Sequence, residues 1–151
     1  MSDDNIWSDE WGEQGDDWSG GGGLAKQLPR GPELGATVYQ LDRGNFGIYH
    51  FHHRSEEILI VLSGRPTLRT PDGSRALEPG AVVHFPVGPA GAHALTNEAD
   101  EAVRFVMVSG RGAPEVVEYP DLGQITVQGP GGSQTGERLW FIHDVPEGAS
   151  D

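Results

Sequence analysis

The sequence predicts an all-β fold, a small sandwich or barrel built from short strands. From Ala36 onward, short runs rich in β-forming residues alternate with clusters of glycine, proline and aspartate. No segment carries the periodicity of a helix longer than one or two turns, and no internal repeat is present. At 151 residues the chain is long enough for one domain with a real hydrophobic core.

The expected strands follow one another at short intervals and are bounded by turn residues. The main ones are Ala36–Leu41, Phe46–His52, Glu57–Leu62, Thr67–Thr70, Ala81–Phe85, His93–Asn97 and Ala102–Ser109. A hairpin turn at Pro71–Ser74 leads into a short strand at Arg75–Leu77. Val116–Tyr119 and Ile125–Gln128 are expected as edge strands, and Arg138–His143 as a last strand.

The first 23 residues have the composition of a disordered acidic tail. They hold seven acidic residues and no basic one, and they end in a run of four glycines. Trp7, Trp11 and Trp18 would share one face of a helix, but the glycines among them oppose a helix. We expect a mostly disordered tail with one or two tryptophans resting on the domain, or else a motif that folds against a partner. The expected division is tail 1–23, barrel 24–128, and loop with C-terminal extension 129–151, with the tail dispensable for folding.

Charge and composition exclude several classes of function. With 23 acidic and 10 basic residues the formal net charge is −13, which argues against binding to nucleic acid or to an anionic membrane. There is no cysteine, so a metal would be held by imidazole and carboxylate groups. No signal peptide or membrane-length apolar run is apparent, and a cytoplasmic location is the default expectation.

Four residues have a spacing that favours a common metal site. His50 and His52 are two positions apart on a predicted strand, so both side chains point the same way, roughly 6.6 Å apart along the backbone. After four intervening residues, Glu57 opens the next strand and returns beside them. His93 follows a turn rich in proline and glycine and is the fourth candidate.

The same residues carry a resemblance to the cupin superfamily. The spacing of Gly44, His50, His52, Glu57 and Gly64 resembles the first cupin motif without a gap. The spacing of Gly80, Pro86, Gly88, His93 and Asn97 resembles the second cupin motif. It differs in one respect, because four residues separate Gly88 from His93 where cupins usually have two. A subgroup of small single-domain cupins shares this longer turn. The resemblance covers about residues 34–119 and implies a jelly-roll-like β-barrel.

Together, spacing and resemblance assign His50, His52, Glu57 and His93 as ligands of a divalent transition metal. Three imidazoles and one carboxylate suit iron, manganese, cobalt, nickel, copper or zinc without distinguishing among them. An octahedral ion held this way keeps two positions for water, oxygen or substrate. His53 and His84 fall on the opposite phase and are expected at the surface, and Asn97 is expected to satisfy backbone groups at a turn.

Strand alternation predicts an apolar wall around this ion. The residues expected to face inward are Phe46, Ile48, Leu59, Val61 and Leu95, joined by Phe85 and Phe105 and, less directly, by Tyr39 and Met107. No second carboxylate or lysine stands out as a general base. The direction of Arg104 stays open because both faces of its strand are mostly apolar.

Three classes of function remain open, since the superfamily includes enzymes, storage proteins and sensors. The first is a metal-dependent enzyme acting on a small organic substrate by oxygen-dependent or Lewis-acid chemistry. The second is a non-catalytic metal-binding or small-molecule-binding module, such as a sensor. The third is a scaffold whose acidic tail docks a partner. Phosphate recognition needs several converging donors, so sugar-phosphate isomerisation is disfavoured. A homodimer is expected, because similar cupins pair and Trp140–Ile142 is apolar.

Overall fold

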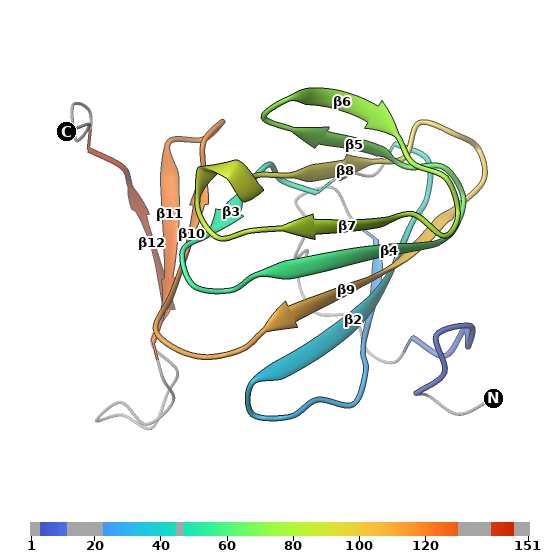
Figure 1. Cartoon of the computed structure of the whole chain (residues 1–151), viewed down its shortest axis with the longest axis horizontal. Coiled ribbons are helices and arrows are strands. Elements are labelled where there is room, and N and C mark those ends of the chain that lie inside the picture. Colours follow the sequence, from blue (N-terminus) through green and yellow to red (C-terminus); the bar gives the residue numbers. More distant parts are fainter. Residues whose placement is uncertain (1–3, 12–22, 45–46, 130–139, 147–151) are drawn as a thin grey trace.

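The computed structural model describes residues 4–11, 23–44, 47–129 and 140–146, and these form three antiparallel sheets (Figure 1). The largest sheet has the spatial order β1 (Leu24–Gln27), β2 (Leu34–Leu41), β9 (Val103–Gly110), β4 (Glu57–Ser63) and β7 (Val82–Phe85). The second has the order β12 (Trp140–Asp144), β11 (Gln124–Gln128), β10 (Glu115–Tyr119) and β3 (Phe51–His52). The third consists of β6 (Gly73–Ala76), β5 (Thr67–Thr70) and β8 (Ala94–Thr96). The all-β prediction is confirmed.

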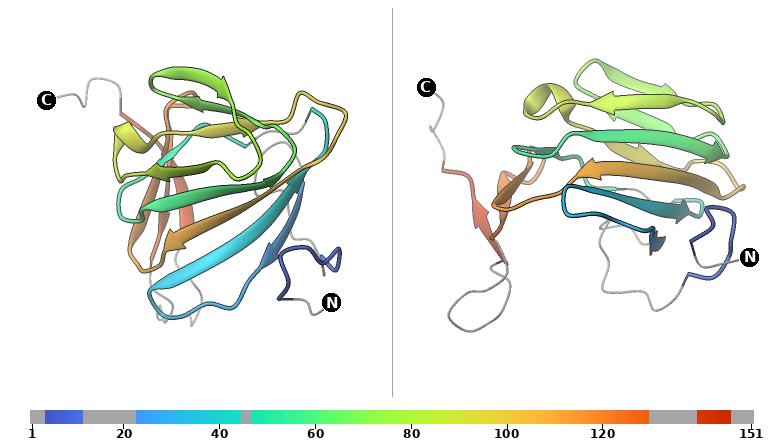
Figure 2. Two further views of the ribbon diagram at one scale, coloured as in Figure 1. Left: turned by 45° about the vertical axis from the view of Figure 1, so that its right-hand side comes forward. Right: turned by 60° about the horizontal axis from the view of Figure 1, so that its bottom comes forward.

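The hydrophobic core lies between the five-stranded and the three-stranded sheets, which curve around it as a jelly-roll-like barrel (Figure 2). Strand β4 shows why: its burial alternates along the strand, with Glu57, Leu59 and Val61 turned inward. The side chains that pack against Leu59 and Val61 come from strands of both sheets and from the loop at Leu77. The buried core cluster is Leu41, Leu59, Val61, Leu68, Leu77, Phe85, Leu95, Val103 and Phe105.

The predicted strands agree with those observed except in the segment that carries the first two histidines. Instead of one strand from Phe46, only Phe51–His52 is regular, and His50 forms an isolated bridge with His93. Residue 46 lies outside the described residues. At Gly47 the backbone N–H donates to Leu95 O at 2.9 Å. The segment therefore follows the three-stranded sheet first and joins β10 only at its end. Strand β1 was not predicted, because Leu-Ala-Lys-Gln lacks a strand pattern.

The N-terminal segment 4–11 contacts the barrel through two buried cations. Lys26 and Arg104 are each 7% exposed. The Lys26 ammonium donates to the carbonyls of Asn5 and Ser8, both at 3.0 Å. The Arg104 guanidinium donates to Ile6 O at 3.3 Å and pairs with Asp9.

This settles the direction of Arg104, which points away from the barrel interior, and it changes the view of the tail. Trp11 rests on the domain, because its ring lies 5.3 Å from the Lys26 ammonium and 4.9 Å from the Arg104 guanidinium. Residues 4–11 thus make contacts with the barrel that the acidic composition did not suggest. The rest of the predicted tail, including Trp18, lies outside the described residues.

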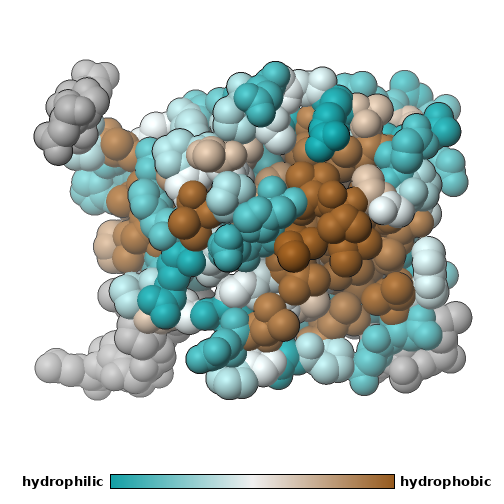
Figure 3. Space-filling view, viewed as in Figure 1, coloured by the Kyte–Doolittle hydropathy of each residue, from teal (hydrophilic) through white to brown (hydrophobic). Residues whose placement is uncertain are grey.

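The outer face of the five-stranded sheet is apolar over β4, β7 and β9, where brown residues gather in one patch (Figure 3). Ile58 on β4 and Val82 on β7 remain 39% and 65% exposed. At the opposite edge of the molecule, Trp140, Phe141 and Ile142 of β12 are also exposed. Within the described part of the chain, no helix has the length and apolar character needed to cross a membrane.

Candidate metal and substrate site

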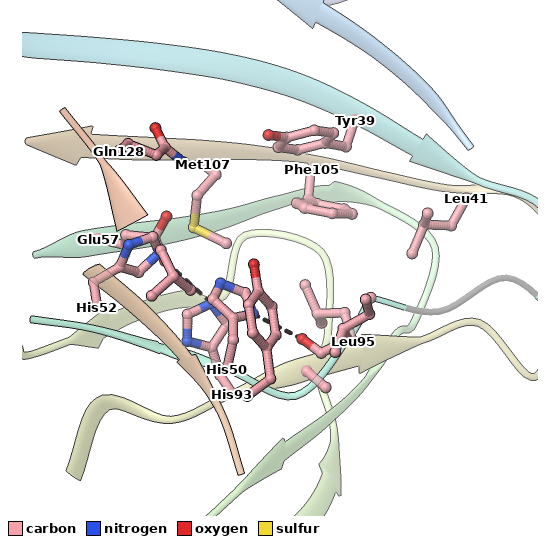
Figure 4. Close-up of a pocket in the computed structure, with 15 residues that line it drawn as sticks. Tyr39, Leu41, His50, His52, Glu57, His93, Leu95, Phe105, Met107 and Gln128 are labelled. Carbon is pink, nitrogen blue, oxygen red and sulfur yellow. Dashed lines mark hydrogen bonds and ion pairs between the residues drawn. The ribbon is translucent and has the colours of Figure 1, made fainter. Parts of the chain in front are cut away.

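Three of the predicted ligands, His50, His52 and Glu57, converge at one end of the barrel, and the fourth, His93, lies beside Glu57 (Figure 4). Ligand-capable atoms of His50, His52 and Glu57 all lie within 4.8 Å of one another. The Glu57 carboxylate is central, since its Oε2 lies 3.3 Å from His52 Nε2 and 3.2 Å from His93 Nε2. The imidazoles of His50 and His93 are 4.7 Å apart between ring centres. The convergence of His50, His52 and Glu57 agrees with their spacing in the sequence, whereas His93 was added through the second cupin motif.

Two of the histidines are held in one tautomer by backbone carbonyls. His50 Nδ1 lies 2.7 Å from Ile48 O, and His93 Nδ1 lies 2.8 Å from Gly91 O. A carbonyl oxygen only accepts, so each Nδ1 carries the proton and donates it. The Nε2 lone pair of each ring is then available as a ligand.

The longer turn before His93 is shaped to deliver this side chain. Gly88 has φ +83°, and the following residues Pro89–Gly91 form a single 3₁₀ turn. Gly91 packs so closely that a Cβ there would lie 1.7 Å from Pro86 O. With the turn closed in this way, His93 N and O both pair with the backbone of His50, at 3.0 and 3.2 Å. The two extra residues therefore leave His93 in place.

Several polar atoms of this cluster are buried without a hydrogen-bond partner among the described residues. They include both ring nitrogens of His52, Glu57 Oε2 and His93 Nε2. Leaving a buried polar atom unpaired costs about 1–3 kcal/mol. A group of such atoms directed at one point fits a metal ion, which would satisfy them together.

The electrostatics of the cluster favour a charged Glu57 carboxylate beside a neutral His50 imidazole. Burial alone would raise the pKa of Glu57, but His52 and His93 beside it lower that pKa well below its usual range. Burial lowers the pKa of His50 to about 4, and His93 adds to the effect. For His52, burial acts downward, but the carboxylates of Glu57 and Glu115 outweigh it and raise the pKa.

A cavity of about 340 Å³ opens beside the cluster. Its walls are mainly apolar, and the neutral polar groups of Tyr39, Tyr119 and Gln128 join them. The fifteen lining residues are Tyr39, Leu41, Gly47, Ile48, His50, His52, Glu57, His93, Ala94, Leu95, Phe105, Met107, Val117, Tyr119 and Gln128. None of these is a lysine or an arginine. Burial raises the pKa of Tyr39, so its phenol remains a neutral donor.

The hairpin of β10 and β11 forms one wall of this cavity, contributing Val117, Tyr119 and Gln128. Its tip is fastened across the barrel, because Asp121 accepts a hydrogen bond from Arg69 Nη2 at 3.0 Å. The Arg69 guanidinium also stacks 3.8 Å above the ring of Tyr49. These contacts are exposed and join the tip of the hairpin to β5.

The other sequence predictions were largely confirmed. Ile48, Leu95, Phe105, Tyr39 and Met107 line the cavity, whereas the equally inward Leu59, Val61 and Phe85 belong to the core behind it. Asn97 is fully buried and donates to two backbone carbonyls. His53 and His84 are exposed and pair with surface glutamates.

Sequence reasoning missed the contribution of β10 and β11. Tyr119 and Gln128 were expected on edge strands, and Glu115 was not singled out at all. Alternation along Val116–Tyr119 could have indicated that Val117 and Tyr119 share a face. Only the pairing of Val117 with His52 across β10 and β3 indicates which face meets the site.

Comparison with known proteins agrees with this architecture. The model of the cupin domain family matches residues 37–109. A crystal structure of a putative sugar phosphate isomerase from Acidithiobacillus ferrooxidans is 27% identical, with 80% of this chain and 76% of that chain covered and a TM-score of 0.65.

Two further structures extend the likeness. A sugar phosphate isomerase from Silicibacter pomeroyi, 22% identical over 82% of this chain and 76% of that one, has a TM-score of 0.70 and shows the fold alone. KdgF from Halomonas sp. is 25% identical over 64% of this chain and 86% of that one, with a TM-score of 0.55. No curated protein matches the sequence. With the barrel, both motifs and the family match in agreement, residues 37–109 of this chain form a cupin domain.

Proposed function

We propose that this cupin is a metal-dependent enzyme that acts on a small, uncharged or singly charged organic molecule. The metal would be a divalent transition ion held by His50, His52, Glu57 and His93. The observation that carries the proposal is the set of buried, unpaired ligand atoms on three of these residues, all facing one point beside a cavity. When bound, such an ion polarises an oxygen donor or activates oxygen at its open positions.

The cavity supports a small substrate with limited charge. Its volume of about 340 Å³ is near the lower end of ligand sites, which span about 300–1,000 Å³. The apolar wall formed by Ile48, Leu95 and Phe105 would hold a hydrocarbon or aromatic part. The Tyr39 phenol would donate a hydrogen bond to a substrate oxygen, because its raised pKa keeps the proton on it near neutral pH. Gln128 offers both a donor and an acceptor.

A second candidate is the isomerisation of a phosphorylated sugar. It is favoured by the 27% identity to the putative sugar phosphate isomerase. The cavity speaks against it, since no lysine or arginine is among the lining residues and Arg104 is engaged with the N-terminal segment. A phosphate group would have to rely on neutral donors or stay at the cavity mouth. We therefore rank this candidate second.

The test begins with elemental analysis of protein purified without added metal. Protein loaded with iron and, separately, with manganese is then offered phosphosugars and phenolic or enol compounds, while isomer formation and oxygen uptake are followed. Turnover of a phenol or enol supports the first proposal. Efficient isomerisation of a phosphosugar overturns it in favour of the second. Metal binding with no turnover in either assay favours a non-catalytic binding module or sensor.

We also propose that the protein works as a homodimer. The support is the exposed apolar surface that the fold leaves on β12, at Trp140, Phe141 and Ile142, and on the outer face of β4 and β7. Light scattering at micromolar concentration should give the mass of two chains. If β12 forms the interface, replacing Ile142 with Ser should weaken dimerisation. If the outer face of the five-stranded sheet forms it, replacing Val82 with Ser should do so. A monomeric wild type would rule the proposal out.

A further inference from the structure

Glu115 is a buried carboxylate that lies directly behind the site and outside the residues matched by the family model. It begins β10 and is 7% exposed. Its Oε1 accepts hydrogen bonds from the backbone N–H groups of Arg54 and Val116, at 3.1 and 3.0 Å. These two bonds fix the orientation of the carboxylate. Its other oxygen, Oε2, is buried and has no hydrogen-bond partner among the described residues.

The unpaired oxygen faces the unpaired nitrogen of a predicted ligand. Glu115 Oε2 lies 3.8 Å from Nδ1 of His52, and that nitrogen is also buried without a hydrogen bond. The distance is about 1 Å longer than a charge-assisted hydrogen bond. A modest rotation of the imidazole would close it. Both groups carry a desolvation cost that this one bond would remove.

A comparison of the three histidines shows what is missing at His52. His50 and His93 each donate Nδ1–H to a carbonyl two residues earlier, at Ile48 and Gly91. Among the residues that the structure describes, no carbonyl bonds to His52. If its Nε2, which faces Glu57, is to present a lone pair to the common point, its Nδ1 must carry the proton and needs an acceptor. Glu115 is the group that stands there.

We propose that Glu115 is a positioning residue that fixes the tautomer and orientation of His52. The inference rests on the proposed metal site, which it deepens. A carboxylate does more than a carbonyl in this place, because its charge also makes the imidazole a stronger donor to an ion. The sheet register supplies the geometry: Val117 pairs with His52, and Glu115, two residues away, shares its face of β10.

The test compares Glu115→Gln with wild type, and Glu118→Gln serves as the matched control. Glu118 is on the same strand but on the other face, where it contacts the exposed His53. In Glu115→Gln the amide oxygen can still accept the two backbone N–H groups, while the NH₂ group faces His52. Two donors would then oppose each other, which favours the wrong tautomer. Each protein is stripped with a chelator and titrated with zinc against a chromophoric competitor.

We expect zinc affinity to fall about 10–100-fold in Glu115→Gln and to stay unchanged in Glu118→Gln. The tautomer is read independently from ¹⁵N NMR of histidine-labelled, metal-free protein at about pH 9, where imidazoles are neutral. The signal of His52 is identified by its loss in His52→Asn. Wild type should carry the proton on Nδ1, and Glu115→Gln should move it to Nε2.

The outcomes separate this inference from the proposed function. If wild type binds zinc, and Glu115→Gln has the same affinity and the same His52 tautomer, the proposed role of Glu115 is wrong. The metal site is then unaffected. Wild type that binds no zinc overturns the metal site. If wild type binds no zinc, or if Glu115→Gln fails to fold, the tautomer of His52 in wild type still tests the role of Glu115. A proton on Nε2 of His52 contradicts the inference, and a proton on Nδ1 supports it.

Discussion

Two histidine–carboxylate pairs join β10 to the last residue of β3 and to the residue after it, one turned into the barrel and the other turned to solvent. On the inner face, His52 Nδ1 lies 3.8 Å from Glu115 Oε2, and both atoms are buried without a hydrogen bond. On the outer face, His53 Nε2 is 3.1 Å from Glu118 Oε2 in an exposed contact. The histidines are neighbours in the sequence, and alternation along the strand sends them to opposite sides.

The difference shows that burial decides the importance of such a pair more than its distance does. Water can replace the exposed bond between His53 and Glu118 at little cost, so exposed pairs contribute about 0–1 kcal/mol. The facing atoms of His52 and Glu115 are buried, and leaving them unpaired is costly. We therefore expect metal binding to depend on the longer, buried contact and not on the exposed one. The predictions below test this contrast, from the largest expected effect to the smallest.

Replacing His52 with Ala should have the largest effect. It removes one of the four proposed ligands, and we expect bound metal to fall from about one ion per chain to a small fraction of that. Elemental analysis of purified protein measures the change. The control is His53→Ala, one residue away on the outer face, which should keep the full amount. Full metal content in His52→Ala would refute the ligand assignment.

Replacing Gly91 with Ala should damage both the site and the fold. The new Cβ would meet Pro86 O at 1.7 Å, so the backbone of the turn must move, and with it the neighbouring His93. We expect a loss of about 1–4 kcal/mol in the free energy of unfolding and weaker metal binding.

Chemical denaturation and zinc titration measure these two quantities. Gly31→Ala is the control, because no atom lies within 4 Å of the Cβ built there. A Gly91→Ala protein as stable as wild type would show that the turn can relax and that its tight packing is not needed to hold His93.

Deletion of residues 1–11 should have a moderate effect that is confined to stability. The deletion removes the partners of Lys26 and Arg104, but both cations then become accessible to water, which limits the loss to about 1–3 kcal/mol. For a chain of this size that corresponds to about 2–4 °C in melting temperature per kcal/mol. Metal content should not change, since the segment lies outside the cavity. An unchanged melting temperature would restore the sequence-based view that this segment is dispensable.

The smallest effect is expected at the exposed pair. Two double-mutant cycles measure the free energy of zinc binding. The cycle with His53→Ala and Glu118→Gln should give a coupling energy below about 0.5 kcal/mol. The cycle with His52→Ala and Glu115→Gln should give a larger one. Equal couplings in the two cycles would show that burial does not distinguish the pairs.

The sequence alone determined the type of fold and the predicted ligand set. Short runs between turn residues were enough for an all-β chain, because strand alternation and turn chemistry are local properties. The spacing of His50, His52 and Glu57 was equally informative, since it needs only one strand and one short connection. His93 was found through its motif, and the longer turn before it did not displace it.

Tertiary structure decided what no local pattern contains. The partners of Lys26 and Arg104 are 18 to 98 positions away along the chain, and nothing in an acidic, glycine-rich tail indicates that Asn5 to Asp9 would reach them. Glu115 is 63 positions from His52 and gains its place only from the register of β10 on β3. Side-chain alternation follows from the covalent chain itself. Register and docking follow from packing among distant segments, and only the folded chain shows which of its charges are buried and beside what.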